Sequence, residues 1–98
     1  MCRMFAHQPM RNYEAQTRSI RIGGHSTSIR LENTFWSILE EIAALEGTSV
    51  AKFVTTLHDE VLAHQGRVHN LASLLRCSCV IYVSQATGQR AIPQIAAE

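Results

Sequence analysis

The chain has 98 residues, of which 46% are hydrophobic, and its formal net charge at pH 7 is +1. This size fits one small domain with tails, and the hydrophobic content argues against a disordered chain. No apolar run approaches the roughly 20 residues of a membrane span, and the N-terminus lacks a hydrophobic secretory core. We therefore expect a soluble, cytoplasmic protein that does not enter membranes.

The small net charge conceals an uneven distribution along the chain. Residues 1–31 contain five arginines and one glutamate, a net charge of +4, whereas residues 32–60 contain six acidic residues and one lysine, a net charge of −5. A phosphate backbone attracts the first segment and repels the second. Any nucleic-acid surface is therefore expected on the N-terminal side, and the acidic residues also solvate the outer faces of helices.

The chain divides into three expected parts. Residues 1–17 show no sustained hydrophobic period, so we expect a flexible N-terminal arm there. Residues 18–83 carry the regular patterns of one domain. Residues 84–98 resemble a tail, because a glycine and a proline break any long period.

Alternating residues predict two short strands, at 18–22 and 26–31. The apolar residues of the first strand fall on even-numbered positions, and those of the second fall on odd-numbered positions. One continuous regular strand cannot place both sets on the same face. Gly23 and Gly24 either reset the register through a bulge or turn, or form a short loop between two strands. The sequence leaves both arrangements open.

Apolar residues at helical spacing predict two helices after the second strand. The first is expected to begin at Asn33, whose side chain can cap exposed amides, and to stop at Gly47. Thr48 or Ser49 then caps the second helix. The expected inward stripes are Phe35, Ile38, Leu39, Ile42 and Leu45, with Trp36 at the edge, and then Val50, Phe53, Val54, Leu57 and Val61.

A third helix is expected from Asn70 to about Val83, and it contains Cys77 and Cys79. A metal site is the main alternative for these two thiols. Positions two apart on a helix project about 200° apart, so both sulfurs would not readily reach one ion. Buried thiols that pack as small hydrophobic groups are favoured. We predict no metal site and no cofactor.

The strand-helix-helix unit of residues 26–61 has only 36 residues. A core below about 40 residues is rarely sufficient without disulfides, metal or oligomerisation, and three cysteines cannot make a disulfide framework. We therefore expect a homodimer. In it, the strands at 26–31 of two copies pair antiparallel and form an intermolecular two-stranded ribbon.

Such a ribbon is narrow enough to enter the major groove of DNA. Ser26, Ser28 and Arg30 share the polar face of the strand and are the predicted base contacts. Arg30 is the strongest candidate, because arginine can donate a bidentate pair to guanine, whereas a serine hydroxyl specifies less. The start of the second helix offers free amides and a positive dipole end to phosphate. The predicted phosphate contacts are Thr48, Ser49, Lys52 and Arg21.

The order of strand, helix, Gly turn and helix resembles the ribbon-helix-helix family of dimeric DNA-binding regulators. The resemblance rests on SerThrSerIleArgLeu at 26–31, IleAlaAlaLeuGluGlyThrSerVal at 42–50 and the stripe of the second helix. A closer likeness, which includes AsnLeuAlaSerLeuLeuArg at 70–76, is to a bacterial subfamily sometimes labelled arylsulfate sulfotransferase-like. The sequence offers no chemical reason for that label. The resemblance implies a mainly α-helical homodimer whose alternate strand residues enter the major groove and whose second-helix start holds phosphate.

We predict a dimeric transcriptional regulator that binds double-stranded DNA and is not an enzyme. Asp59 and Glu60 are adjacent rather than converging, and no serine or cysteine lies in a recognisable nucleophile motif, so no catalytic residue is assigned. The alternative is a ribbon-helix-helix interaction module, antitoxin-like or an adaptor, with weak or no DNA binding. It would bind a protein partner through the acidic helices or the C-terminal region, and it would not need the basic N-terminal segment.

Overall fold

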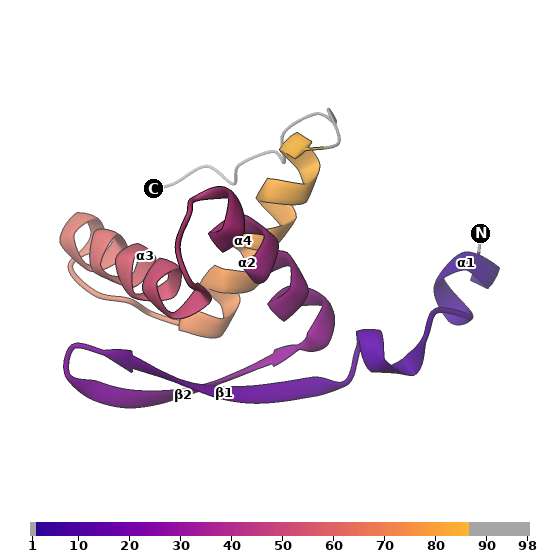
Figure 1. Ribbon diagram of the computed structural model, residues 1–98, viewed down its shortest axis with the longest axis horizontal. Helices are drawn as coiled ribbons and strands as arrows, with labels where there is room; N and C mark the ends of the chain where they lie inside the picture. The colour runs from indigo at the N-terminus through magenta and orange to yellow at the C-terminus, as the bar shows by residue number, and fades with distance from the viewer. Residues whose placement is uncertain (1, 87–98) are drawn as a thin grey trace.

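The structure is a computed structural model, and it describes residues 2–86. Within this range a two-stranded sheet lies along one side of the molecule, and α2, α3 and α4 pack against one of its faces (Figure 1). The helix α1 stands apart from this body at the N-terminal end (Figure 1). The elements are α1 (Cys2–Ala6), the 3-10 helix η1 (Met10–Asn12), β1 (Ala15–Ile22), β2 (His25–Glu32), α2 (Asn33–Leu45), α3 (Val50–Gln65) and α4 (Leu71–Ala86).

The two strands form a hairpin within one chain. Gly23 and Gly24 have φ angles of 59° and 82°, and two consecutive positive φ values are typical of the tight type I′ turn. The strands are antiparallel, and the register runs from Ile22 opposite His25 to Ala15 opposite Glu32. The sequence left open whether Gly23 and Gly24 interrupt one strand or separate two strands. The structure shows that they separate two strands. Within one chain the partner of β2 is therefore β1, and the predicted pairing between the strands of two copies stays a prediction.

The hairpin register also resolves the mismatch between even and odd apolar positions. Residues directly opposite one another in an antiparallel pair point to the same face, and this register sets even positions of β1 opposite odd positions of β2. All four apolar side chains therefore point to the face that the helices cover. Their exposed fractions are 4% for Ile20, 7% for Ile22, 3% for Ile29 and 0% for Leu31.

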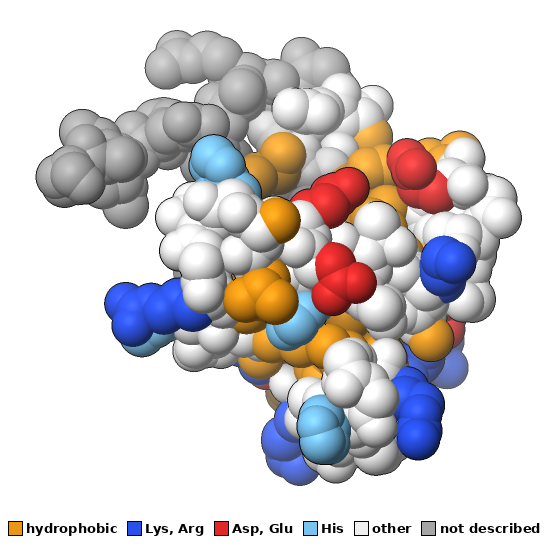
Figure 2. Space-filling model, turned by 90° about the vertical axis from the view of Figure 1, so that its left-hand side faces the viewer, with side chains coloured by type: hydrophobic (Ala, Val, Ile, Leu, Met, Phe, Trp, Pro, Cys, Tyr) orange, Lys and Arg blue, Asp and Glu red, His pale blue; other side chains and the backbone are white. Residues whose placement is uncertain are grey.

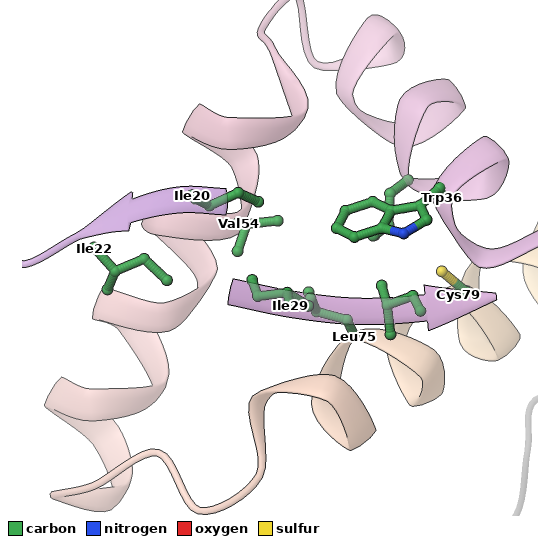
Figure 3. Close-up of a cluster of buried hydrophobic side chains, with 9 residues drawn as sticks. Ile20, Ile22, Ile29, Trp36, Val54, Leu75 and Cys79 are labelled. Carbon is green, nitrogen blue, oxygen red and sulfur yellow. The ribbon is translucent and has the colours of Figure 1, made fainter. Parts of the chain in front are cut away.

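The core lies between this hairpin face and the three helices (Figure 3). In Figure 3, α3 brings Val54 against β1, whereas α4 brings Leu75 and Cys79 alongside β2. Trp36 reaches the same cluster from α2 (Figure 3). The largest side chains that are less than 2% exposed are Trp36, Leu31, Leu39, Leu75, Val54 and Cys79.

The apolar stripe of α2 is rotated relative to the prediction. Trp36 is 1% exposed and is central to the core rather than at its edge, and Leu39 and Ala43 continue its line at helical spacing. Leu45, predicted to point inward, is 72% exposed. It follows Ala43 by two positions, so its side chain projects about 200° away from that of Ala43. The position of Trp36 sets this rotation, because its Nε1 donates a hydrogen bond of 2.8 Å to the Gln16 carbonyl.

The start of α2 is held by the N-terminal segment rather than by its own side-chain cap. Glu32 occupies the N-cap position, and the Asn33 side chain makes no cap; instead Nδ2 donates to the Arg11 carbonyl at 2.9 Å. Thr34 Oγ1 likewise donates to the Asn12 carbonyl at 2.8 Å. The predicted cap at Asn33 is therefore wrong. The expected arm of residues 1–17 contains α1, η1 and the first residues of β1, which begins three residues earlier than predicted.

The later helix boundaries follow local capping chemistry. The Ser49 side chain accepts a hydrogen bond of 3.1 Å from the Lys52 amide and confirms the predicted cap of α3. Asn70 Oδ1 accepts one of 3.1 Å from the Ser73 amide at the start of α4. That helix continues to Ala86, three residues beyond the predicted end. Residues 87–98 of the predicted tail lie outside the described residues.

Candidate nucleic-acid interface

The hairpin face that the helices leave uncovered is polar except for Ala15 at its end, which lies opposite Glu32. Strand side chains alternate, so the residues between the buried ones point the other way. The register places Ser19 opposite Ser28, Thr17 opposite Arg30 and Arg21 opposite Ser26. Each of these six side chains is exposed. We define them as the outer ribbon face: Thr17, Ser19, Arg21, Ser26, Ser28 and Arg30.

The outer ribbon face contains two arginines and no acidic residue, although Glu32 at the end of β2 interacts electrostatically with Arg30 and is itself paired with Arg76. Arg21 and Arg30 take part in none of the ion pairs formed by the described residues. In Figure 2, which looks toward the hairpin turn, basic side chains flank the lower edge where the hairpin lies, and acidic side chains lie over the helices. Basic side chains also lie at the level of the helices, so the separation of charge in space is partial, but Arg21 and Arg30 on the hairpin remain suited to phosphate.

A third strand arginine, Arg18, has a different role. It lies opposite Ile29 in the register and therefore points to the helical side. Its guanidinium stacks over the Trp36 ring at 4.5 Å from the ring centroid and donates to Glu40 Oε2 at 2.9 Å. Both contacts use Arg18 within the fold, so it is not part of the outer ribbon face.

The predicted phosphate contacts lie on two elements that the structure joins. Thr55 Oγ1 donates to the Arg21 carbonyl at 3.1 Å and so holds α3 against the edge of β1. Lys52 is exposed and lies three positions before Thr55, on the same side of the helix. Ser49 is exposed but already caps its own helix, and Thr48 is half-buried. The structure thus brings Lys52 and the start of α3 to the strand that carries Arg21.

Two residues of the outer ribbon face are absent from the contacts predicted from sequence. Thr17 falls within the expected arm, and Ser19 lies on the polar side of its expected strand without being a predicted contact. The hairpin register puts them beside Arg30 and Ser28. The glycine pair was the signal that could have identified them, because a two-residue turn determines which residues face each other.

The two edges of the hairpin differ in how their backbone groups are used. The residues that flank a two-residue turn form a hydrogen-bonded pair, and bonded and non-bonded pairs then alternate. Ser26, Ser28 and Arg30 belong to the non-bonded pairs, so their N–H and C=O groups point away from β1. No hydrogen bond from the described residues reaches these groups. On the other edge the Arg21 carbonyl accepts from Thr55, whereas no hydrogen bond from the described residues reaches the backbone groups of Thr17 and Ser19, so β2 has the edge that is free along its whole length.

The cysteines of α4 lie on opposite sides of the helix. Cys77 is exposed, whereas Cys79 is buried and its Sγ donates to the Phe35 carbonyl at 3.6 Å. Burial raises the pKa of the Cys79 thiol to about 11, so the thiol is protonated at neutral pH. No group of three or more His, Cys, Asp or Glu side chains within residues 2–86 is placed to hold a metal ion. In the same range no helix is long and apolar enough to cross a bilayer.

A β-hairpin with an exposed, basic outer face, followed by helices that cover its inner face, defines a ribbon-and-helix domain. The family model described as "Ribbon-helix-helix domain" matches residues 15–83, and the chain belongs to that family. The match covers both strands and extends through most of α4.

One solved structure extends the likeness beyond the matched domain. The chain is 44% identical to an uncharacterized protein from Bordetella pertussis Tohama I, with a TM-score of 0.85. The alignment covers 90% of this chain and 71% of that chain. A search of curated proteins finds no match. None of these comparisons supports the sulfotransferase-like label.

Proposed function

We propose that this protein is a homodimeric, non-enzymatic transcriptional regulator of the bacterial cytoplasm that binds double-stranded DNA through the outer ribbon face. The observation that carries the proposal is the outer ribbon face itself, with two arginines that no ion pair of the described residues occupies and no helix above it. Membership of the ribbon-helix-helix family supports the same function.

In the proposed dimer the open edges of two β2 strands pair antiparallel across a two-fold axis. The unpaired backbone groups of Ser26, Ser28 and Arg30 support this arrangement, because an exposed strand edge is a template for another strand. In this arrangement each β2 strand is bonded to β1 of its own chain on one side and to β2 of the second copy on the other. The result is a four-stranded sheet.

The dimensions of such a sheet suit the major groove. Neighbouring strands lie about 4.8 Å apart, so the two β1 strands of the dimer are about 14 Å apart, whereas the groove is about 12 Å wide. The paired β2 strands therefore enter the groove, and the β1 strands lie over its phosphate walls. This geometry assigns base contacts to Ser26, Ser28 and Arg30. The phosphate contacts are Arg21 on β1 and Thr48, Ser49 and Lys52 at the start of α3.

The test is a titration with DNA duplexes selected from a random pool, read by fluorescence anisotropy at two salt concentrations. Arg30→Ala should flatten sequence preference and reduce discrimination by about 1–3 kcal/mol. Arg21→Ala should weaken binding to all sequences alike and lower the salt slope by about one unit for each phosphate that is no longer neutralised. Arg67→Ala is the matched control, because Arg67 is exposed in the connection between α3 and α4. The proposal fails if the wild type shows no salt-sensitive binding, or if Arg30→Ala leaves the preference unchanged.

The alternative function is a protein-interaction module, antitoxin-like or an adaptor, that uses the same fold. Exposed apolar side chains on α4 and acidic side chains on α2 favour it. A copurified protein partner, together with no salt-sensitive DNA binding by the wild type, would select this alternative. Binding of selected duplexes would instead select the regulator.

A further inference from the structure

The helix α4 exposes apolar side chains on its outward side, between the exposed polar residues Ser73 and Gln85. Leu75 and Cys79 are fully buried, yet Val80 and Ile81 are 46% and 47% exposed. An exposed apolar patch that polar residues border is typical of an interaction site. We define the outer α4 face as Cys77, Val80 and Ile81, which line a hollow of about 290 Å³ together with Arg76.

The outer α4 face also lacks unpaired charge. Arg76 is the sole charged residue of α4, and it is already engaged within the chain, because its Nε donates to Glu32 Oε1 at 3.0 Å. By contrast α2 carries Glu40, Glu41 and α3 carries Asp59, Glu60 at exposed positions. A two-fold interface brings the same patch of both subunits together, so a charged patch would repel itself, whereas a neutral apolar patch complements itself.

The position of α4 relates this face to the open strand edge. In Figure 3, β2 lies between β1 and the first turns of α4, and α4 packs against β2. The helix α3 instead packs against β1, on the far side of the hairpin. Pairing of two β2 edges across a two-fold axis therefore brings the two α4 helices toward each other and keeps the two α3 helices apart.

We infer that the outer α4 face packs against the outer α4 face of a second copy of this chain, as a helical layer beside the paired β2 strands. The inference rests on the dimer of the proposed function but not on DNA binding. It explains why α4 contains only one charged residue, which is itself paired. It also places Cys77 of both copies close to the two-fold axis.

The first test introduces like charges into the contact between the two outer α4 faces, which we call the seam. Val80→Glu/Ile81→Glu should raise the dimer dissociation constant at least about a hundredfold, because juxtaposed like charges cost several kcal/mol and every 1.4 kcal/mol is a factor of ten. Leu62→Glu is the matched control, since Leu62 is 44% exposed on α3, away from the open edge. Analytical ultracentrifugation measures the constant, and circular dichroism verifies folding. Equal constants for the wild type and the double variant would overturn the inference.

The second test does not depend on a disruptive substitution. In a Cys2→Ser background, a short bifunctional maleimide should link two chains through Cys77, because Cys79 is buried. Cys2→Ser/Cys77→Ser is the control and should give no linked dimer. If the charged variant fails to fold, this cross-link decides: linked dimers support the seam, and their absence overturns it. A monomeric wild type also overturns it, and the hollow then has another occupant, either residues 87–98 or a different protein.

A DNA titration on the same proteins separates this inference from the proposed function. Loss of the dimer in the charged variant, with no DNA binding by the wild type, retains the seam and rejects the regulator. DNA binding by the wild type, with a dimer insensitive to the two substitutions, rejects the seam and retains the regulator.

Discussion

At the scale of single residues, the position in the strand decides what an arginine does. Arg18 and Arg21 are three positions apart on β1, so they point to opposite faces. Arg18 is held by Trp36 and Glu40, whereas Arg21 is exposed on the outer ribbon face. The same residue type is therefore structural at one site and available for phosphate at the other.

Trp36 connects several parts of the fold, and its replacement should be costly. Trp36→Phe removes the hydrogen bond to the Gln16 carbonyl and leaves unfilled volume, so we expect a loss of about 1–2 kcal/mol in the free energy of unfolding. Urea denaturation followed by circular dichroism measures it. Tyr13→Phe, at a side chain that is 56% exposed, is the control and should change little. Equal stabilities of the two variants would contradict this role of Trp36.

Glu32, at the junction between β2 and α2, should make the free energy of unfolding depend on pH. A hydrogen bond with its own backbone amide, and then the Arg76 guanidinium, hold the pKa of Glu32 below its ordinary value of 4.5. Because the folded pKa is the lower one, the ionised carboxylate stabilises the fold above the ordinary value. That contribution is lost as the pH falls through the lowered value.

The difference in unfolding free energy between wild type and Glu32→Gln should therefore be present at neutral pH and shrink in acid. Urea denaturation at a series of pH values measures it. Glu46→Gln controls for the removal of one exposed carboxylate that takes part in no ion pair of the described residues. A difference for Glu32→Gln that stays constant into acid would contradict the assignment.

At the scale of elements, the two-residue turn organises the domain. It pairs β1 with β2, sets the register and collects four apolar side chains on one face and six polar ones on the other. The helices then distribute over the two strands, α3 on β1 and α4 on β2. Only a turn that accepts positive φ at both central positions allows this register without strain.

Substitutions at the first turn residue test this dependence on backbone conformation. A Cβ on Gly23 would meet nothing within 4 Å, so any penalty comes from its φ of +59°. Gly23→Val should lower the free energy of unfolding by about 1–2 kcal/mol, since the left-handed region is costly for L residues. Gly23→Asn should have a small effect, because asparagine is favoured in type I′ turns. Thermal or urea denaturation compares them, and equal effects would contradict the turn assignment.

At the scale of the whole molecule, one chain leaves two surfaces incomplete. The edge of β2 has unpaired backbone groups, and α4 exposes Val80 and Ile81. Both lie on the same side of the hairpin, opposite the side that α3 covers. In the proposed dimer a second copy would satisfy both surfaces at once, and it would double the positive charge of the outer ribbon face.

The proposed dimer should therefore persist in high salt. Apolar burial and backbone pairing hold it, and salt screens exposed ion pairs far more than it weakens the burial of apolar surface. Light scattering at micromolar concentration should give twice the mass of the chain at low and at high ionic strength. DNA binding, measured in the same buffers, should fall steeply over that range. Dissociation of the protein into single chains as salt rises would contradict this account of the dimer.

The sequence by itself determined the order of the two strands and of α2, α3 and α4, the polar face of β2 and the stripe of α3, because these depend on residues that are near neighbours in the chain. The strand partner, the rotation of α2 and the different roles of the arginines were decided only by the tertiary structure. Each depends on a contact between distant residues, such as Trp36 with the Gln16 carbonyl or Arg76 with Glu32. Local periodicity determines which residues share a face, but packing between elements determines what that face meets.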